Sequence, residues 1–387
     1  MRTFTLHIPT RFVFGWSTLD RIGRETKRVA QKVLLVCSSG SVMRTGIFDR
    51  VIKSLNQEDI EVDVFDKVIP NPRASTMNHA GELARDLGVQ AIIGLGGGSA
   101  MDTAKGAAIV AVNGGSIWDY IHTHRTVNNS LPVIAVPTLS ATGSEGNAYG
   151  VVTDDKTLQK ASFICFAARP KIALIDPQLS LTVPENYLKD GAIDVICHAL
   201  EAFFTTRDEA PFNNHFSLLL ARTAADMILE ILKYPYSQLP RETFAWTATL
   251  ALSDLNDAGR EGPYAMHALA HPLSGLYNIS HGRALAFILP RYLLYFKKEC
   301  YHQILELGAT FGDTKATIES AFNAFLSFLK KIDRFLSWQD ILSEKPDIKT
   351  LTHHVFTLNQ NRKGFVQGPR PMTQEDIKNI YTLSLYL

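Results

Sequence analysis

Short apolar runs rich in β-branched residues alternate with segments of helical spacing through the first half of the chain. These runs are candidate strands, because Val and Ile suit the pleated, buried surface of a sheet. They cover residues 33–39, 60–68, 91–97, 132–138 and 172–176. The segments 42–57 and 76–88 between them predict helices, the second closing on Gly88. Alternating strand and helix implies parallel pairing, so this half predicts a doubly wound α/β sheet of the Rossmann-like kind.

From about residue 190 onward, the pattern changes to helices alone. Helical spacing runs through residues 192–204, 214–232, 243–255 and 317–332. A chain of 387 residues is long enough for two domains of ordinary size. We therefore predict an α/β domain over 1–183 and an all-helical domain over 184–387, joined through the proline-containing stretch 177–187.

Charge and cysteine usage exclude several kinds of partner. Lys and Arg (39) nearly cancel Asp and Glu (38), which gives no general attraction to nucleic acid or to an anionic membrane. No run of eighteen apolar residues predicts a membrane span. The four cysteines show no CxxC pair and no zinc-knuckle spacing, so we expect a protein of the reducing cytoplasm.

A glycine-rich segment, "AIIGLGGGSAMDTAKGAAIV", follows the third candidate strand. Glycines let backbone N–H groups approach phosphate oxygens, and the following helix adds unpaired donors and partial positive charge. Ser99 stands where a full GxGxxG motif has its third glycine. Two interpretations remain open: a pyrophosphate site, or a tight strand-to-helix turn with Ser99 as the N-cap.

A second small-residue loop, "VPTLSATGSE", follows the fourth candidate strand. Its four hydroxyls, on Thr138, Ser140, Thr142 and Ser144, are donors for phosphate, ribose or amide. The alternative is a polar loop with ordinary Ser and Thr turns. Because both loops follow strands of one parallel sheet, both are expected at its carboxyl edge, where such folds bind ligands.

Histidines and one carboxylate concentrate in the predicted helical half. Asp194 and His198 are spaced i, i+4, as are His267 and His271, and His281 follows ten residues later. Such pairs also arise by chance on surface helices, but the apolar neighbours of these residues indicate buried positions. Buried ionisable groups need partners, and nitrogen and carboxylate ligands without sulfur suit Fe²⁺, Zn²⁺, Mn²⁺ or Co²⁺.

Four segments together carry a resemblance to a known family. They are residues 94–108, 135–154, 190–203 and 266–290, which include "DGAIDVICHALEAF" and "MHALAHPLSGLYNISHGRALAFILP". The chain resembles the iron-containing (group III) alcohol dehydrogenases, in their butanol dehydrogenase and aldehyde reductase branch. The resemblance covers nearly the whole chain. "SATGSEGN" departs from the commoner "AGTGSE", which leaves subfamily and substrate open.

The resemblance implies a set of site residues in a cleft between a dinucleotide-binding domain and a helical metal-binding domain. The metal ligands would be Asp194, His198, His267 and His281, with Fe²⁺ expected and Zn²⁺ as the alternative. His271 would lie beside the metal as a proton-relay or substrate-contacting residue. The family is commonly dimeric, so a homodimer is expected. The cofactor groove would be formed by Asn71, Gly97, Gly98, Ser99, Asp102, Thr138, Leu139, Lys160 and Leu179.

The implied function is hydride transfer between NAD(P)(H) and a primary alcohol or aldehyde. A metal held by three imidazoles and one carboxylate would act as a Lewis acid on the substrate oxygen. The alternatives are a glycerol dehydrogenase-like or dehydroquinate synthase-like relative of the same superfamily, and a binding protein with a closed structural metal site.

Cofactor choice depends on the end of the first predicted strand. Family members that prefer NAD typically carry an acidic residue there, which binds the ribose hydroxyls and repels a 2′-phosphate. Residues 37–44 contain no acid and offer Ser38, Ser39, Gly40, Ser41 and Arg44. We therefore predict that NADP(H) is preferred over NAD(H).

Overall fold

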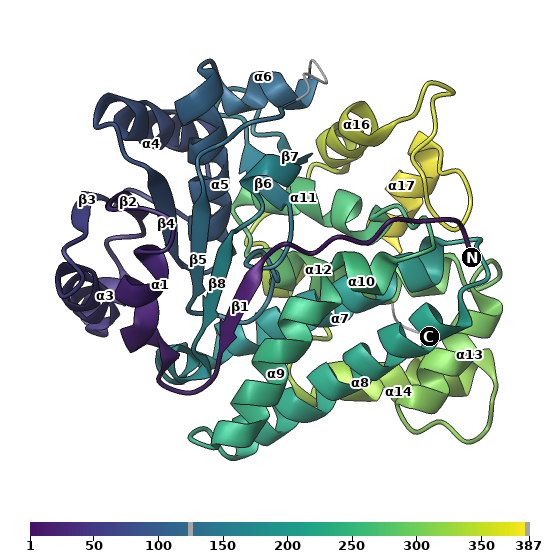
Figure 1. Cartoon of the computed structure of the whole chain (residues 1–387). Helices are drawn as coiled ribbons and strands as arrows, with labels where there is room; N and C mark the ends of the chain where they lie inside the picture. Colours follow the sequence, from purple (N-terminus) through teal and green to yellow (C-terminus); the bar gives the residue numbers. More distant parts are fainter. Residues whose placement is uncertain (123–126, 384–387) are drawn as a thin grey trace. The chain divides into compact units, whose positions relative to one another are not determined.

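The structure, a computed structural model, describes residues 1–122 and 127–383 (Figure 1). The chain forms two compact units, each assembled from more than one segment. The α/β unit comprises His7–Pro184 and Lys233–Ser253, and the helical unit comprises Met1–Leu6, Glu185–Leu232 and the chain from Asp254 onward. The division into a dinucleotide-binding domain ending at residue 183 and a metal-binding domain beginning at residue 184 stays a prediction.

A six-stranded parallel sheet forms the centre of the α/β unit (Figure 1). The predicted fold class is confirmed: all five predicted strands are present, and every pairing in the sheet is parallel. In spatial order, the strands are β1 (Arg11–Phe14), β8 (Ile172–Ile175), β5 (Val133–Pro137), β4 (Ala91–Gly96), β2 (Lys32–Val36) and β3 (Glu61–Phe65).

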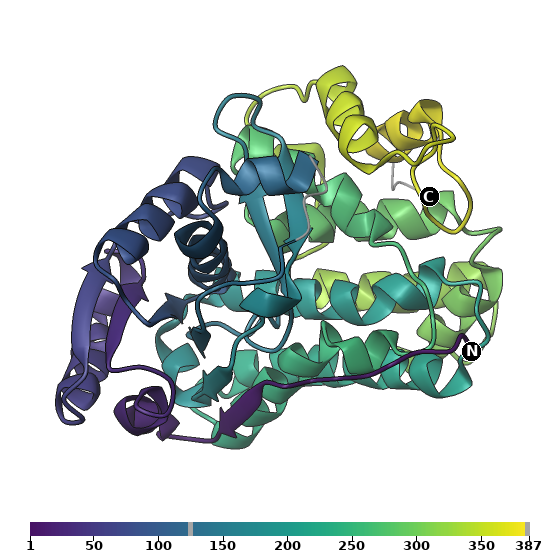
Figure 2. The ribbon, with the colours of Figure 1, turned by 45° about the horizontal axis from the view of Figure 1, so that its top comes forward.

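Both faces of the sheet are buried, because side chains alternate between two hydrophobic layers. On β2, Leu34 and Val36 pack with residues of α4 (Ala74–Asp86) and α5 (Gly98–Asn113). Val33 and Leu35 pack on the other side with residues of α1 (Ile22–Thr26) and α3 (Ile47–Asn56). Helices α4 and α5 run side by side (Figure 2). A parallel strand buried on both faces needs a continuous apolar run, which explains why β2, β4, β5 and β8 were predictable.

The strand order reverses between β2 and β4. These strands are neighbours, although β3 lies between them in the sequence and forms the sheet edge beyond β2. In doubly wound sheets, ligands bind at the carboxyl ends of the strands at such a reversal. The turns that follow β2 and β4 are therefore the expected position for a dinucleotide.

Three local features differ from the sequence predictions. The predicted helix 42–57 is two helices, α2 (Ser41–Arg44) and α3, separated at Gly46, whose φ of 71° favours glycine. Strand β1 and the antiparallel hairpin of β6 (Tyr149–Thr153) and β7 (Lys160–Ile164) were not predicted. The proposed linker begins as a 3₁₀ helix, η3 (Pro177–Thr182), and ends inside α7.

Several short elements and one long helix complete the α/β unit. Helix α9 lies among the helical segments of the second half but packs against η3 in this unit. These elements are η1 (Thr18–Arg21), α6 (Ile117–His122), η2 (Phe166–Ala168) and α9 (Gln238–Ala251).

The helical unit is organised around α7, which packs against α11 and α12. In the described part of the chain, no helix combines the length and apolar character needed to cross a membrane. The helices are α7 (Glu185–Thr205), α8 (Pro211–Lys233), α10 (Asp254–Asp257), α11 (Ala265–Tyr277), α12 (His281–Tyr295), α13 (Tyr301–Thr310), α14 (Ile318–Lys331), α15 (Trp338–Ile341), α16 (Ile348–Asn359) and α17 (Gln374–Thr382).

Candidate functional site

Helix α7 places Asp194 and His198 one turn apart in the interior of the helical unit. Asp194 is 2% exposed and His198 is 4% exposed, because they lie in the stretch Leu188–Thr205 of α7, in which every residue is buried. The Nδ1 atom of His198 lies 3.6 Å from Asp194 Oδ1. The i, i+4 spacing therefore places both polar groups on one buried helix face, as predicted.

Helices α11 and α12 bring two more imidazoles to the same carboxylate. His267 lies near the start of α11 and His281 is the first residue of α12. Their Nε2 atoms lie 3.8 Å and 3.7 Å from Asp194 Oδ1. Asn278, with a φ of 55°, ends α11 in the left-handed conformation and lets the chain turn into α12. The packing of three helices thus converges on Asp194.

This cluster fits a divalent cation. One ligand atom each from Asp194, His267 and His281 lies within 4.8 Å of the other two. Ligand atoms around a tetrahedral ion with bonds of about 2.1 Å lie about 3.4 Å apart. The distances of 3.6–3.8 Å from Asp194 Oδ1 to the three imidazole nitrogens are close to this value. His198 adjoins this triplet, with its ring stacked on that of His267 at a centroid distance of 4.4 Å. Three imidazoles and one carboxylate provide the nitrogen and oxygen donors that Fe²⁺ and Zn²⁺ accept.

The pKa of His267 shows that the cluster favours positive charge. Burial alone would lower the pKa of His267, but the carboxylates of Asp194 and Glu201 outweigh burial and raise that pKa to about 9. Glu201, on α7, is fully buried and accepts a hydrogen bond from Nδ1 of His267 at 2.7 Å. The two acids therefore favour positive charge at this place, which is what a bound cation supplies.

His271 lies one turn after His267 on α11, outside the ligand triplet. It is 8% exposed, and its ring centroid lies 5.5 Å from that of His281. The i, i+4 spacing of His267 and His271 is equally consistent with a pair of ligands, so spacing alone does not separate their roles. In the structure, the ring of His271 is beside the cluster.

In the α/β unit, the two predicted cofactor loops contact each other. Gly97 is the N-cap of α5 and Gly98 its first residue. A Cβ atom on Gly98 would lie 2.6 Å from Cγ2 of Thr142, and one on Gly97 would lie 4.0 Å from Cβ of Leu139. Glycine at position 98 is therefore required by the close approach of the loop that follows β5. The turns after β4 and β5 therefore lie against each other at the carboxyl edge of the sheet.

Asp102 holds the glycine-rich turn in place from inside. Its Oδ1 accepts from the Ser144 hydroxyl at 2.7 Å, and its Oδ2 accepts from the backbone N–H of Val151 at 3.0 Å. Burial raises the pKa of Asp102. Lys105, which the sequence analysis did not single out, is fully buried and donates to Ser144 Oγ at 2.8 Å; burial lowers the pKa of Lys105 to about 8. This network ties α5 to the second loop and to β6.

The remaining predicted cofactor residues also follow strands of the sheet or lie on the hairpin. Asn71 follows β3, is 6% exposed, and accepts from Nζ of Lys160 on β7 at 3.0 Å. Leu179 lies in η3 after β8 and is 3% exposed. The predicted residues placed at or near carboxyl strand ends are Ser38, Ser39, Gly40, Ser41, Asn71, Gly97, Gly98, Ser99, Thr138, Leu139 and Leu179.

Glu201 is the residue of the histidine cluster that the sequence analysis missed. The signal was present in "DVICHALEAFF", where Glu201 follows His198 by three residues and interrupts an apolar run. That spacing places Glu201 on the same helix face as His198. A single acidic residue in an apolar helix needs a buried partner, just as the buried histidines do.

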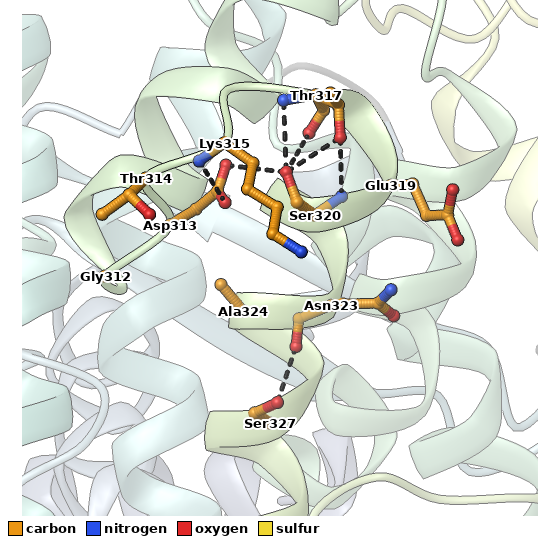
Figure 3. A pocket seen from close by; sticks show the side chains of 10 residues that line it. All are labelled: Gly312, Asp313, Thr314, Lys315, Thr317, Glu319, Ser320, Asn323, Ala324 and Ser327. Carbon is orange, nitrogen blue, oxygen red and sulfur yellow. Dashed lines mark hydrogen bonds between the residues drawn. The ribbon is translucent and has the colours of Figure 1, made fainter.

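A polar hollow of about 540 Å³ at the start of α14 is unrelated to the cluster (Figure 3). Its hydrogen bonds belong to the helix terminus: Thr317 caps α14, and Ser320 donates to Asp313 at 3.0 Å. None of the residues that line the hollow is buried. It is a feature of helix capping.

Comparisons with known proteins agree across both units. Residues 9–177 match the family model described as iron-containing alcohol dehydrogenase. Residues 189–385 match the model described as the Fe-containing alcohol dehydrogenase family, C-terminal. Together the two matches cover most of the α/β unit and most of the helical unit.

Individual relatives point in the same direction. The chain is 30% identical over 335 residues to the probable NADH-dependent butanol dehydrogenase 1 of Bacillus subtilis (strain 168), which covers 87% of each chain. It is 31% identical over 293 residues to the NADPH-dependent aldehyde reductase YqhD of Escherichia coli (strain K12), covering 75% of each. The crystal structure of NADH-dependent butanol dehydrogenase A from Thermotoga maritima is similar with a TM-score of 0.93, at 33% identity over 98% of each chain.

Proposed function

This chain belongs to the iron-containing alcohol dehydrogenase family, and from that membership we propose how its own residues divide the reaction. The protein is an oxidoreductase that transfers a hydride between a nicotinamide cofactor and an alcohol or aldehyde. The relatives reported above are named for butanol and for aldehydes. We take primary alcohols and the corresponding aldehydes as its substrate class.

Asp194, His198, His267 and His281 are the proposed metal ligands, with Fe²⁺ expected and Zn²⁺ as the alternative. The observation that carries this assignment is the convergence of three imidazoles, two buried and that of His281 partly buried, on one carboxylate oxygen. Nε2 of His267 is buried and has no hydrogen-bond partner among the described residues, as expected for an atom reserved for a cation. When bound, such a cation polarises a substrate oxygen as a Lewis acid.

His271 is the proposed proton-carrying residue. Oxidation of an alcohol releases the hydroxyl proton, and an imidazole titrates close enough to neutrality to accept and pass on that proton. The position of His271 supports this role, because its ring is 5.5 Å from that of His281 and outside the ligand triplet. The cofactor supplies the hydride chemistry itself.

The nicotinamide cofactor is proposed to bind at the carboxyl edge of the parallel sheet. Gly97, Gly98 and Ser99 would bind the pyrophosphate through backbone N–H groups at the start of α5, a helix of sixteen residues. Thr138 and Leu139 on the second loop would complete this part of the groove. Lys160 and Leu179 are proposed on the nicotinamide side, and Asn71, which accepts from Lys160, on the cofactor-side loop. Asp102 is proposed to act indirectly, by holding the glycine-rich turn.

NADP(H) is the proposed preference. The turn after β2 contains Ser38, Ser39, Gly40 and Ser41 and no acid. A Cβ atom built on Gly40 would lie 3.8 Å from both the Ser38 hydroxyl and a guanidinium nitrogen of Arg44. A hydrogen-bond donor, Ser38, and a cation, Arg44, are therefore both close to this turn. Such groups suit a 2′-phosphate. The relatives include enzymes named for NADH and one named for NADPH, so family membership leaves the choice open.

We also propose a cytoplasmic homodimer. All four cysteines are buried and none forms a disulfide, which is consistent with a reducing compartment. Strand β1 is an edge strand, and its last residue, Phe14, is in edge-to-face contact with Trp246. These two residues remain 37% and 39% exposed. An exposed aromatic pair on a free sheet edge is suited to a second copy. Light scattering coupled to gel filtration would detect the dimer, and a monomer at micromolar concentration would contradict it.

The function is tested by steady-state kinetics on protein reconstituted separately with Fe²⁺ and Zn²⁺. Absorbance of NADPH and NADH is followed with a panel of short primary aldehydes. Steady consumption with at least one metal supports the proposed reaction, and a higher kcat/KM with NADPH supports the cofactor assignment. A preference for NADH would contradict that assignment, and no turnover with any aldehyde would contradict the substrate class.

A further inference from the structure

Glu201 lies directly behind the proposed metal ligand His267. It is on α7, one turn after His198, and its side chain is fully buried. Its Oε1 accepts two hydrogen bonds from His267, one from the backbone N–H at 2.8 Å and one from Nδ1 of the ring at 2.7 Å. One carboxylate oxygen therefore fixes both the start of α11 and the orientation of the imidazole.

This arrangement fixes the tautomer of His267. A carboxylate only accepts hydrogen bonds, so the proton shared with Oε1 resides on Nδ1. In the neutral ring, the lone pair is then on Nε2, the atom that lies 3.8 Å from Asp194 Oδ1. Nε2 is buried and has no hydrogen-bond partner among the described residues. The lone pair is directed to the place where Asp194 and His281 offer their own ligand atoms.

Charge balance points the same way. A carboxylate removed from water is costly unless a positive group compensates it. For the residues that the structure describes, the one ion pair recorded for Glu201 is with His267. A cation bound to Nε2 of His267 would compensate the negative charge of Glu201 from the opposite side of the imidazole ring. The Glu201 carboxylate would in turn make the imidazole a more basic metal ligand.

Resting on the ligand set proposed above, we propose that Glu201 is a positioning residue for the metal. It acts through His267 by holding the ring with Nε2 toward the cation and by adding negative charge behind it. A purely structural role would be to anchor α11 to α7 through the backbone N–H of His267. The two roles differ in what they affect: the first sets metal affinity, and the second sets stability alone.

Two substitutions separate these roles. Glu201→Gln keeps an acceptor oxygen of the same reach and removes the charge, whereas Glu201→Leu removes both. The control is Glu145→Gln, a buried glutamate that accepts from Thr249 Oγ1 at 2.6 Å and belongs to the α/β unit, whereas the proposed ligands belong to the helical unit. Each apoprotein is titrated with Zn²⁺ against a chromophoric chelator, and its thermal unfolding is recorded without metal.

We expect Glu201→Gln to weaken Zn²⁺ binding about tenfold and Glu201→Leu about a hundredfold, within the range known for partners of metal-bound histidines. Glu145→Gln is expected to bind Zn²⁺ like the wild type even if it unfolds at a lower temperature. Absorption of the Co²⁺-substituted protein should shift in Glu201→Gln and not in Glu145→Gln, because that spectrum reports the ligand field.

The proposal is overturned if folded Glu201→Gln retains wild-type Zn²⁺ affinity and an unchanged Co²⁺ spectrum. If Glu201→Leu does not fold, Glu201→Gln alone decides. Asp194→Ala serves as the separate test of the ligand set. Retention of metal by Asp194→Ala would refute the ligand set itself, whereas loss of metal in Asp194→Ala with normal binding in both Glu201 variants would refute only the role of Glu201.

Discussion

The ring centroids of His271 and His281 lie 5.5 Å apart, yet the two residues differ in their relation to the metal cluster. His281 has a ligand atom within 4.8 Å of those of Asp194 and His267, and His271 is outside this triplet. We expect His267→Ala and His281→Ala to lose bound metal. His271→Ala should keep one metal per chain and lose about a hundredfold in kcat, because proton transfer by a positioned base contributes that much. Metal content after reconstitution, measured by mass spectrometry, and kcat on the same samples test this division.

A matched control for the histidine variants is available in the same unit. His354 on α16 is 7% exposed and lies outside the proposed machinery. His354→Ala should keep both metal and rate, so it reports the cost of removing a buried imidazole. Loss of metal from His271→Ala, with metal retained in His354→Ala, would show that His271 is a ligand.

The close approach of Thr142 to Gly98 predicts that alanine has different effects at the adjacent positions 97 and 98. A Cβ atom at position 98 would overlap Cγ2 of Thr142 at 2.6 Å, whereas one at position 97 has its nearest neighbour, Leu139 Cβ, at 4.0 Å. Gly98→Ala should destabilise the cofactor-free protein by about 1–3 kcal/mol, as overpacking does. Gly97→Ala should leave that stability unchanged and raise KM for the cofactor, because its methyl group would face the pyrophosphate.

Urea unfolding without cofactor and KM for NADPH test this pair of glycines. Both quantities are measured on the same preparations. Equal stability of the two variants would refute the close packing of the two loops. An unchanged KM in Gly97→Ala would refute the proposed pyrophosphate position.

Arg44 is expected to contribute to NADP(H) selectivity. A nitrogen of its guanidinium and the Ser38 hydroxyl each lie 3.8 Å from the position of a Cβ atom on Gly40. Arg44→Met should lower kcat/KM for NADPH about tenfold, which corresponds to about 1.4 kcal/mol of lost attraction for the 2′-phosphate. The value for NADH should not change. Arg50→Met, which removes an equal charge from α3, is the control, and equal losses with both cofactors in Arg44→Met would contradict the assignment.

The lowered pKa of Asp376 predicts that this residue contributes to stability in a pH-dependent way. Burial would raise the pKa of Asp376, but hydrogen bonds from Arg370, Tyr295 and Thr373 outweigh burial and hold that pKa far below its usual value. A depressed pKa means that the contribution is complete above the unfolded pKa of about 3.9 and is lost as pH falls below it.

Asp376→Asn tests this contribution. It should lower the free energy of unfolding by about 1–2 kcal/mol at pH 7. The difference from wild type should persist down to about pH 5 and shrink below about pH 4. The exposed neighbour Glu375 serves as the control through Glu375→Gln. Urea unfolding at several pH values measures both, and a difference that grows toward acid would contradict the prediction.

The strands show which parts of the fold were predictable. β2, β4 and β5 are buried on both faces, so each carries an apolar run that stands out in the sequence. β1 is four residues of an edge strand and only one of its side chains is buried. Strand β6 belongs to a separate two-stranded hairpin, paired through Tyr149–Thr153 with β7. These segments become strands through pairing with distant residues, which local periodicity does not report.

The same distinction applies to the candidate site. The i, i+4 spacing predicted that Asp194 and His198 share a helix face, since that relation is set within one turn of α7. The relation of His267, His271 and His281 to Asp194 is set by the packing of α11 and α12 on α7. Their separate roles were expected from family resemblance, and spacing by itself would have paired His267 with His271.

The sequence by itself determined the doubly wound sheet, the helical second half, and the residue types available for a metal and a dinucleotide. These follow from short-range periodicity and from turn chemistry, which are properties of neighbouring residues. Only the tertiary structure decided that three imidazoles meet one oxygen of Asp194, that Glu201 lies behind His267, and that Thr142 leaves no room for a side chain at Gly98. Such contacts join residues far apart in the sequence, so they exist only once the helices and loops have packed.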